Sequence, residues 1–421
     1  MQRIEADVLL RGRGAPIEPG VVVMDGGRIT YAGTAAGAPP VGDARVTQAR
    51  TVMPGMWDCH AHFTGSTALD PLRWALEPPA AAGARSAIDA GRALHAGITS
   101  VREVGGLGVH LARAIDDGSV PGPTIHAAGA MLSMTGGHGD LHELPLPVMR
   151  TLSEHVPYLR VCDGEADCRR AVREMLRMGA QLIKVHASGG MMTVLDDPHH
   201  QQFTDGELAA IVDEARRMDR VVAAHCHGKA GIMAALRAGV HTIEHGSWLD
   251  EEAADAMVAA GAMLVPTCFI GRHLREMTSG SASVRSHADD TDLPRHAVAK
   301  VAAAGDRHDE AVRIALAAGV RIAMGTDIFA SHLWGRNAQE AVLLADLGMA
   351  PATVVTAATA NGPLTLGPMA PRSGMLAEGH DADVLTIDGD PLDDIAVLAD
   401  PDRITGVWQA GQPVTAVGTR G

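Results

Sequence analysis

The sequence predicts an α/β fold, a (β/α)₈ TIM barrel with a small β-sandwich domain formed from both chain termini. Three observations predict this architecture. Short β-rich runs alternate eight times with helical patterns over about 300 residues, reactive side chains recur at the ends of these runs, and both flanks contain β-rich runs without helical patterns. An alternation of this length fits a closed parallel barrel better than an open doubly wound sheet.

The strand candidates are brief and are followed by alanine-rich segments with helical periodicity. In chain order they are MWDCHAHF (56–63), ITSVREVG (98–105), TIHAAG (124–129), QLIKVHA (181–187), VVAAHCH (221–227), HTIEHG (241–246), AMLVPTC (262–268) and RIAMGTD (321–327). Helical candidates include residues 82–97, 165–179, 205–219 and 231–239. Five of the expected helices end at a glycine, the residue typical of a left-handed C-terminal cap. These glycines are Gly97, Gly179, Gly239, Gly261 and Gly319.

The flanks have a different pattern. The first contains VVVMDGGRITYAG, with a turn at 25–27, and the last contains DADVLTIDG and ITGVWQAGQPV. Neither flank has enough strands to bury a core alone. We therefore expect residues 1–54 and 365–421 to form one composite β-sandwich domain, with the barrel, residues 55–364, inserted between them.

Composition limits the class of protein and its partners. The 421 residues are 46% hydrophobic and carry a formal net charge of −15, which predicts a globular chain that does not bind nucleic acid. The longest apolar stretch, 260–271, contains a proline and is too short to cross a bilayer, so no membrane partner is expected. The five cysteines are an odd number, which favours reduced thiols and a cytoplasmic location. A homo-oligomer is compatible with the sequence.

The stretch DCHAHF places His60 and His62 one residue apart. Side chains at this spacing on a strand point to one face, so the two imidazoles converge. The chain has 21 histidines, and a single pair of this kind fits coincidence as well as a metal site. The other strand ends decide between these interpretations.

Each of several other strand candidates ends in a potential ligand. The fourth carries Lys184, the fifth His225 and His227, the sixth His245, and the eighth ends at Asp327. In a barrel these side chains come from different strands and point toward one axis. Histidine and aspartate are ordinary metal ligands, so the pattern favours a metal site over coincidence.

Lys184 is the unusual member of this set because its neighbours in QLIKVHA are apolar. Burial beside cations would lower its pKa and favour the neutral amine. A neutral amine can react with carbon dioxide and give a carbamate, an anion with two oxygens that can bridge two metals. The alternative is a lysine that extends to the barrel mouth and binds a substrate carboxylate.

Ordered motifs along nearly the whole chain resemble the amidohydrolase superfamily. They are PGMWDCHAHF, GITSVREVGG, TGGHGD, GAQLIKVHASGG, VAAHCHG, HTIEHG, VPTC, GTD, GRNAQEAVLLADLGM, AATANGPLTLG and GHDADVLTIDGDPL. Within the superfamily, the chain is similar to the branch of prolidase-like, ochratoxinase-like and imidazolonepropionase-related proteins. It differs from the usual pattern at Glu103, where aspartate is common, and it has no tyrosine in the loop after the fourth strand.

The resemblance implies a binuclear site with two divalent metal ions. His60, His62 and Asp327 would hold the first metal, His225 and His245 the second, and Lys184, carboxylated by carbon dioxide, would bridge them. His227 would lie at the mouth, within reach of the substrate's carbonyl oxygen, and His138 in TGGHGD is a further candidate of the same kind. Zinc suits the histidine-rich set best, although manganese, cobalt or iron would also be accepted.

These ligands predict hydrolysis of an amide bond by a metal-bridging hydroxide. Asp327 would take the proton of the water and pass it to the leaving amine. The expected substrate is a small molecule that bears a carboxylate, such as a dipeptide or an N-acyl amino acid, which Arg272 could clamp. His199 and His200, and Trp334, Arg336 and Asn337, are either pocket residues or surface residues.

Two other hypotheses remain at this point. A mononuclear relative could deaminate its substrate or open a cyclic amide without a lysine carbamate, and Lys184 argues against it. A non-catalytic scaffold on the same fold has no need of the six ligands.

Overall fold

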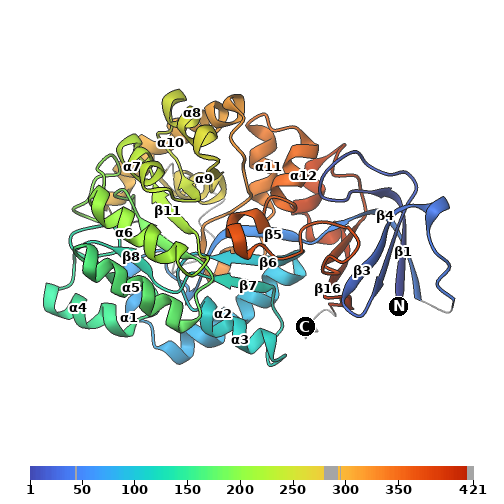
Figure 1. The fold of residues 1–421 in the computed structure, drawn as a ribbon, viewed down its shortest axis with the longest axis horizontal. Coiled ribbons are helices and arrows are strands. Elements are labelled where there is room, and N and C mark those ends of the chain that lie inside the picture. The colour runs from blue at the N-terminus through green and yellow to red at the C-terminus, as the bar shows by residue number, and fades with distance from the viewer. Residues whose placement is uncertain (43–44, 279–292, 294, 415–421) are drawn as a thin grey trace.

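The computed structural model describes residues 1–42, 45–278, 293 and 295–414, which form a barrel and a sheet beside it (Figure 1). The barrel strands are β5 (Met56–Ser66), β6 (Ile98–Glu103), β7 (Thr124–Ala127), β8 (Met131–Ser133), β9 (Leu159–Val161), β10 (Ile183–His186), β11 (Val222–Cys226), β12 (Thr242–His245), β13 (Met263–Val265) and β14 (Ile328–Ala330). They lie in the orders β14-β5-β6-β7 and β13-β12-β11-β10-β8-β9, and all neighbours are parallel.

Backbone hydrogen bonds join these two sheets into one closed barrel. On one side the amide of Gln181 donates to the carbonyl of Ala127 at 2.8 Å. On the other side the amide of Leu264 donates to the carbonyl of Arg321 at 2.9 Å, which brings the eighth run beside β13. The predicted α/β barrel is confirmed.

Two of the expected strands are less regular than their sequences suggest. The third splits into β7 and β8 around Gly129, whose φ of 73° interrupts the extended backbone. In the eighth, residues 321–327, the amides of Thr326 and Asp327 both donate to the carbonyl of His60 on β5. The amide and hydroxyl of Thr326 also donate to the carboxylate of Asp58 on the same strand. The chain resumes as β14 after Asp327, which has a φ of 59°.

Helices surround the barrel on its outer side (Figure 1). They are α1 (Pro71–Leu76), α2 (Pro79–His95), α3 (Gly108–Asp116), α4 (Leu146–His155), α5 (Glu165–Met178), α6 (Asp205–Arg216), α7 (Lys229–Ala238), α8 (Glu251–Ala260), α9 (Cys268–Thr278), α10 (Arg295–Ala318), α11 (Gln339–Asp346) and α12 (Pro351–Ala358). The five predicted glycines all have positive φ, between 68° at Gly261 and 110° at Gly179, and they end helices as expected.

The two ends of the chain pair in one seven-stranded sheet, drawn to the right of the barrel in Figure 1. Its strands are β1 (Gln2–Leu9), β2 (Gly20–Asp25), β3 (Arg28–Thr34), β4 (Arg45–Pro54), β15 (Val384–Ile387), β16 (Ile404–Gln409) and β17 (Gln412–Pro413). The central pairing joins β4 to β15, with Met53 opposite Leu385. A separate apolar cluster, which includes Ile4, Val52 and Val384, packs this domain. The boundaries at 54 and 365 stay a prediction.

The five cysteines are buried and free of disulfides. Among the described residues, no helix combines the length and the apolar character that a membrane span requires. The cytoplasmic location and the homo-oligomer stay predictions of the sequence.

Candidate metal centre

His60 and His62 lie at one face of β5, with their ring centroids 5.3 Å apart. Asp327 approaches them from the end of the eighth run. Its Oδ1 lies 3.1 Å from Nε2 of His62 and 3.4 Å from Nε2 of His60. Each residue offers one ligand atom within 4.8 Å of the others, so this group could hold a metal ion.

A buried carboxylate behind the group fixes the backbone that carries it. Asp58 Oδ1 accepts the amide hydrogens of His60 and Thr326, both at 3.1 Å. Asn337 donates its side-chain Nδ2 to Asp58 Oδ2 at 2.7 Å. Asn337 therefore supports β5 from behind, whereas the sequence left it as a candidate for the pocket.

His225 on β11 and His245 on β12 form the second pair, with ring centroids 4.6 Å apart. His245 Nδ1 lies 2.8 Å from the hydroxyl of Thr267, and His225 Nε2 lies 3.3 Å from the carbonyl of Gly189. These contacts occupy one nitrogen of each ring. The other nitrogen, Nδ1 of His225 or Nε2 of His245, is left to act as a ligand.

Lys184 on β10 lies beside the first pair. Its Nζ is 3.4 Å from Nε2 of His60, and the residue is only 1% exposed. Burial lowers the pKa of Lys184 to about 8, although Glu244 and Asp327 act in the opposite direction. A substantial fraction of the amine is therefore neutral near pH 8.

A buried ion pair orients His60, and the sequence analysis missed it. Glu244 Oε2 lies 2.7 Å from His60 Nδ1, and Arg102 donates through Nη2 to the same carboxylate at 2.7 and 2.8 Å. Both charged side chains are fully buried. The available signal was a charged residue of opposite sign in each of two predicted strands, Arg102 in 98–105 and Glu244 in 241–246.

Four further histidines line the same cavity, namely His138, His186, His227 and His308. His227 lies beside the second pair, 4.9 Å from His245 between ring centroids, and its Nδ1 is 2.8 Å from the hydroxyl of Ser247. His138 stacks on His225 at 4.5 Å. His186 was not predicted, although it follows Lys184 by two residues and so shares its strand face.

Burial determines the protonation states of the histidines in this cavity. It holds the pKa values of His225, His227 and His245 well below the ordinary value of histidine, and neighbouring histidines lower them further. Burial alone would raise the pKa of Asp327, but His60 and His62 hold it well below its usual range. Neutral imidazoles beside an ionised carboxylate are the protonation states that metal binding requires.

The cavity contains all six predicted ligands together with His227 and His138. Its apolar wall includes Trp74, Met131, Leu141, Phe329, Ile270 and Leu274. Arg275 also lines it, whereas Arg272, the arginine that the sequence favoured, does not. Arg275 Nη2 lies 3.2 Å from Asp309 Oδ1.

The remaining loop candidates lie outside the described lining of this cavity. His199 and His200 are exposed, and the ring of His199 lies 4.4 Å from that of Trp248. Trp334 stacks on Phe63 at 4.3 Å. Arg336 lies over the ring of Phe269 at 5.3 Å.

The fold and the site define a TIM-barrel protein with a buried, histidine-rich centre at the ends of its strands. The model of the amidohydrolase family matches residues 51–414, and the chain belongs to this family. Ochratoxinase of Aspergillus niger is 39% identical over 424 residues, which cover 97% of this chain and 85% of that protein. Imidazolonepropionase of Xanthomonas campestris is 26% identical over 60% of the chain and 66% of its own length.

Comparison with solved structures supports the same family assignment. The crystal structure of A. niger ochratoxinase superposes with a TM-score of 0.89 at 37% identity, and the match covers 98% of this chain and 95% of that one. A prolidase complexed with N-methylphosphonate-L-proline has a TM-score of 0.87 at 34% identity and covers 98% and 99% of the two chains. The branch expected from the sequence is confirmed, and the chain is a hydrolase that acts on amide bonds. A non-catalytic scaffold is not supported.

Proposed function

We propose that the chain is a binuclear metal-dependent amidohydrolase that cleaves the amide bond of a dipeptide or an N-acyl amino acid. The observation that carries this proposal is the buried Lys184, whose Nζ lies 3.4 Å from His60 Nε2. A neutral amine here can attack carbon dioxide, so that a nitrogen–carbon bond forms, a proton leaves and a carbamate anion results. The carbamate would compensate part of the charge of two divalent cations.

The donor set suits this assignment. His60, His62 and Asp327 would hold one metal, His225 and His245 the other, and the carbamate of Lys184 would contact both. Zinc fits imidazole and carboxylate ligands and is our expected metal. When bound, the metals would lower the pKa of a water molecule and polarise the scissile carbonyl.

The chain's own residues would then move the protons and hold the substrate. Asp327 would accept the proton of the water and later deliver it to the leaving amine. His227 would donate a hydrogen bond from Nε2 to the carbonyl oxygen, because its Nδ1 is engaged by Ser247. His138 would contact the substrate at the other side of His225, on which it stacks.

The cavity supports a substrate that is apolar at one end and anionic at the other. Its apolar wall would take a large side chain or an acyl group. Arg275 and His138 are the groups that could bind a carboxylate. The guanidinium of Arg275 has five N–H donors, and its pairing with Asp309 leaves some of them free to bind a carboxylate.

A library of dipeptides and N-acyl amino acids, offered to the zinc-loaded protein, tests the substrate class. Within it, N-acetyl-L-phenylalanine and N-acetyl-L-phenylalaninamide form a matched pair that differs in the carboxylate. We expect faster release of acetate from the acid. Equal rates on the two compounds would overturn the carboxylate preference, and an inactive library would overturn the substrate class.

A mononuclear cyclic-amide hydrolase or deaminase is the second candidate. The group of His60, His62 and Asp327 favours it, because these three residues alone could hold one metal. Elemental analysis separates the two candidates. Close to two metals per chain would support the binuclear centre, and one metal in a fully active preparation would support the mononuclear one.

A further inference from the structure

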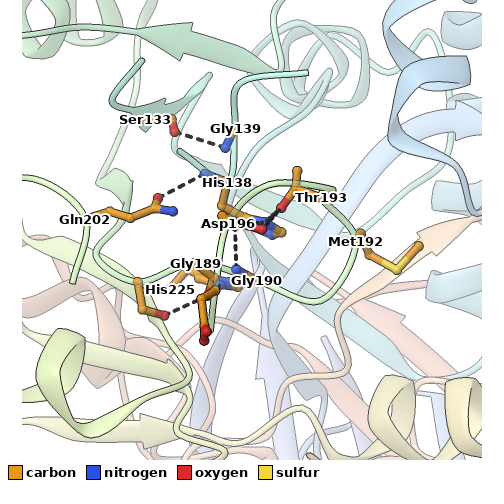
Figure 2. A network of polar contacts seen from close by, with 12 residues as sticks. Ser133, His138, Gly139, Gly189, Gly190, Met192, Thr193, Asp196, Gln202 and His225 are labelled. Atoms are coloured by element: carbon orange, nitrogen blue, oxygen red, sulfur yellow. Dashed lines mark hydrogen bonds and ion pairs between the residues drawn. The ribbon is translucent and has the colours of Figure 1, made fainter. Parts of the chain in front are cut away.

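The loop after β10 contacts two histidines of the cavity at once (Figure 2). The carbonyl of Gly189 lies 3.3 Å from Nε2 of His225. A few residues later, the hydroxyl of Thr193 lies 2.8 Å from Nδ1 of His138, and Asp196 Oδ2 lies 3.3 Å from the same nitrogen. One segment, residues 189–196, therefore orients a proposed metal ligand and a proposed substrate contact.

Lys300 fastens this loop to helix α10. Its Nζ donates to the carbonyls of Gly190 at 3.1 Å, Thr193 at 2.7 Å and Asp196 at 2.5 Å, and to Asp196 Oδ1 at 2.9 Å. An ammonium group has three hydrogens, so these four acceptors saturate it. The side chain of Lys300 is 18% exposed and that of Asp196 is 2% exposed, so the contact is partly shielded from water.

Packing leaves the loop little freedom to shift without moving the histidines. A Cβ at Gly190 would lie 2.1 Å from Cε1 of His138, so the ring rests directly on the loop backbone. The His138 ring also stacks on His225, with an angle of 22° between the two planes. A displaced loop would therefore disturb both rings.

Electrostatics favour the same arrangement. Asp196 lies between Lys300 and His138, which are both potential cations. Burial alone would raise the pKa of Asp196, but His138, Thr193 and Lys300 hold it well below its usual range. The carboxylate is therefore ionised and accepts hydrogen bonds from both sides.

We propose that Lys300 and Asp196 are positioning residues for the reaction, with different targets. Lys300 fixes the loop so that the carbonyl of Gly189 holds Nε2 of His225 and leaves Nδ1 for a metal. Asp196 fixes the ring of His138 for the substrate. This inference rests on the proposed function, because it assigns His225 to a metal and His138 to the substrate.

Two substitutions separate these roles. Lys300→Met should weaken the binding of one of two Co²⁺ ions to the apo-protein by about 10–100-fold, the usual effect of losing support behind a ligand. It should also raise KM. Asp196→Asn keeps the three carbonyl contacts of Lys300, so it should raise KM and leave Co²⁺ binding unchanged. Lys300→Arg, which retains the charge, should restore part of the lost affinity.

The Co²⁺ titration is followed by visible absorption and needs no turnover. Lys229→Met is the matched control, because this lysine pairs with Asp250 and Glu252 at the surface. If Lys300→Met does not fold, Lys300→Gln replaces it. A Lys300 variant that folds and has wild-type Co²⁺ affinity and KM would overturn the inference. Wild-type protein that is active without metal would instead overturn the proposed function.

Discussion

Nδ1 of His60 lies 2.7 Å from Oε2 of Glu244, and both side chains are buried. The contact fixes which nitrogen of His60 faces the carboxylate, so Nε2 is left to face Asp327 and Lys184. Burial alone would raise the pKa of Glu244, but Arg102 and His60 hold it well below its usual range. The ionised carboxylate thus accepts the Nδ1 hydrogen of His60, and a contact of this kind raises the basicity of a metal ligand.

Glu244→Gln should lower the metal affinity of the centre by about 10–100-fold, because the amide can keep a hydrogen bond to His60 but not the charge. Metal titration of the apo-protein measures the change, and circular dichroism checks the fold. Glu252→Gln is the matched control, since that side chain is 70% exposed. Equal affinities of the variant and the wild type would show that Glu244 serves only the stability of the barrel.

Lys184→Ala should lose metal and fall in activity by about 10²-fold or more, because the proposed bridge is removed. Added acetate should restore part of the activity by filling the vacated space with a small anion. A lysine that only bound substrate would raise KM and leave the metal content unchanged. Metal analysis together with kcat and KM distinguishes these outcomes, and Lys229→Ala is the control.

Crystallography of the metal-loaded wild type tests the same residue directly. We expect density beyond Nζ of Lys184 for the three atoms of a carbamate group. Acid-quenched mass spectrometry would miss the group, because a carbamate is labile in acid. A bare amine in a structure with both metals bound would contradict the proposed mechanism.

The sequence predicted which side chains meet in the cavity, because local geometry determines it. Side chains two residues apart on a strand point to the same face, and the carboxyl ends of parallel strands meet at the same end of a barrel. These two rules place His60, His62, His225 and His245 together without a structure. The spacing rule also places His186 on the same strand face as Lys184, so the sequence could have predicted that His186 lines the cavity.

The residues that orient these side chains could not be predicted, because they come from distant parts of the chain. Arg102 and Glu244 are 142 residues apart, and Lys300 lies 104 residues from Asp196. No periodicity connects such residues. The irregular eighth strand is a similar case, since the side chain of Asp58 accepts hydrogen bonds from the amide and the hydroxyl of Thr326, 268 residues away.

Glu103 predicts a pH dependence of stability. Its Oε1 accepts the amide hydrogen of Gly108, the first residue of helix α3, at 3.0 Å. Burial raises its pKa from 4.5 to about 8. The folded chain therefore binds more protons than the unfolded chain between these values, and the contribution of Glu103 to the free energy of unfolding falls as pH rises through this range.

Glu103→Gln should remove this contribution, so the free energy of unfolding should fall less between pH 5 and pH 8 than it does in the wild type. Each unit of pKa change corresponds to about 1.4 kcal/mol. Urea unfolding at both pH values measures the difference, with Glu252→Gln as the control. Parallel pH profiles for Glu103→Gln and the wild type would mean that Glu103 ionises at an ordinary pH.

Asp327→Asn should retain the fold and lose about 10²–10⁴-fold in kcat, the range that a general acid or base contributes. Asparagine has nearly the same shape and can still contact His62, but its amide cannot accept the proton of the water. Metal analysis of the variant separates the loss of a base from the loss of a ligand, because a low kcat with normal metal content assigns the effect to proton transfer. Asp388→Asn, at a carboxylate that is 66% exposed, is the control. A variant with normal metal content and near wild-type kcat would require a different base in the cavity.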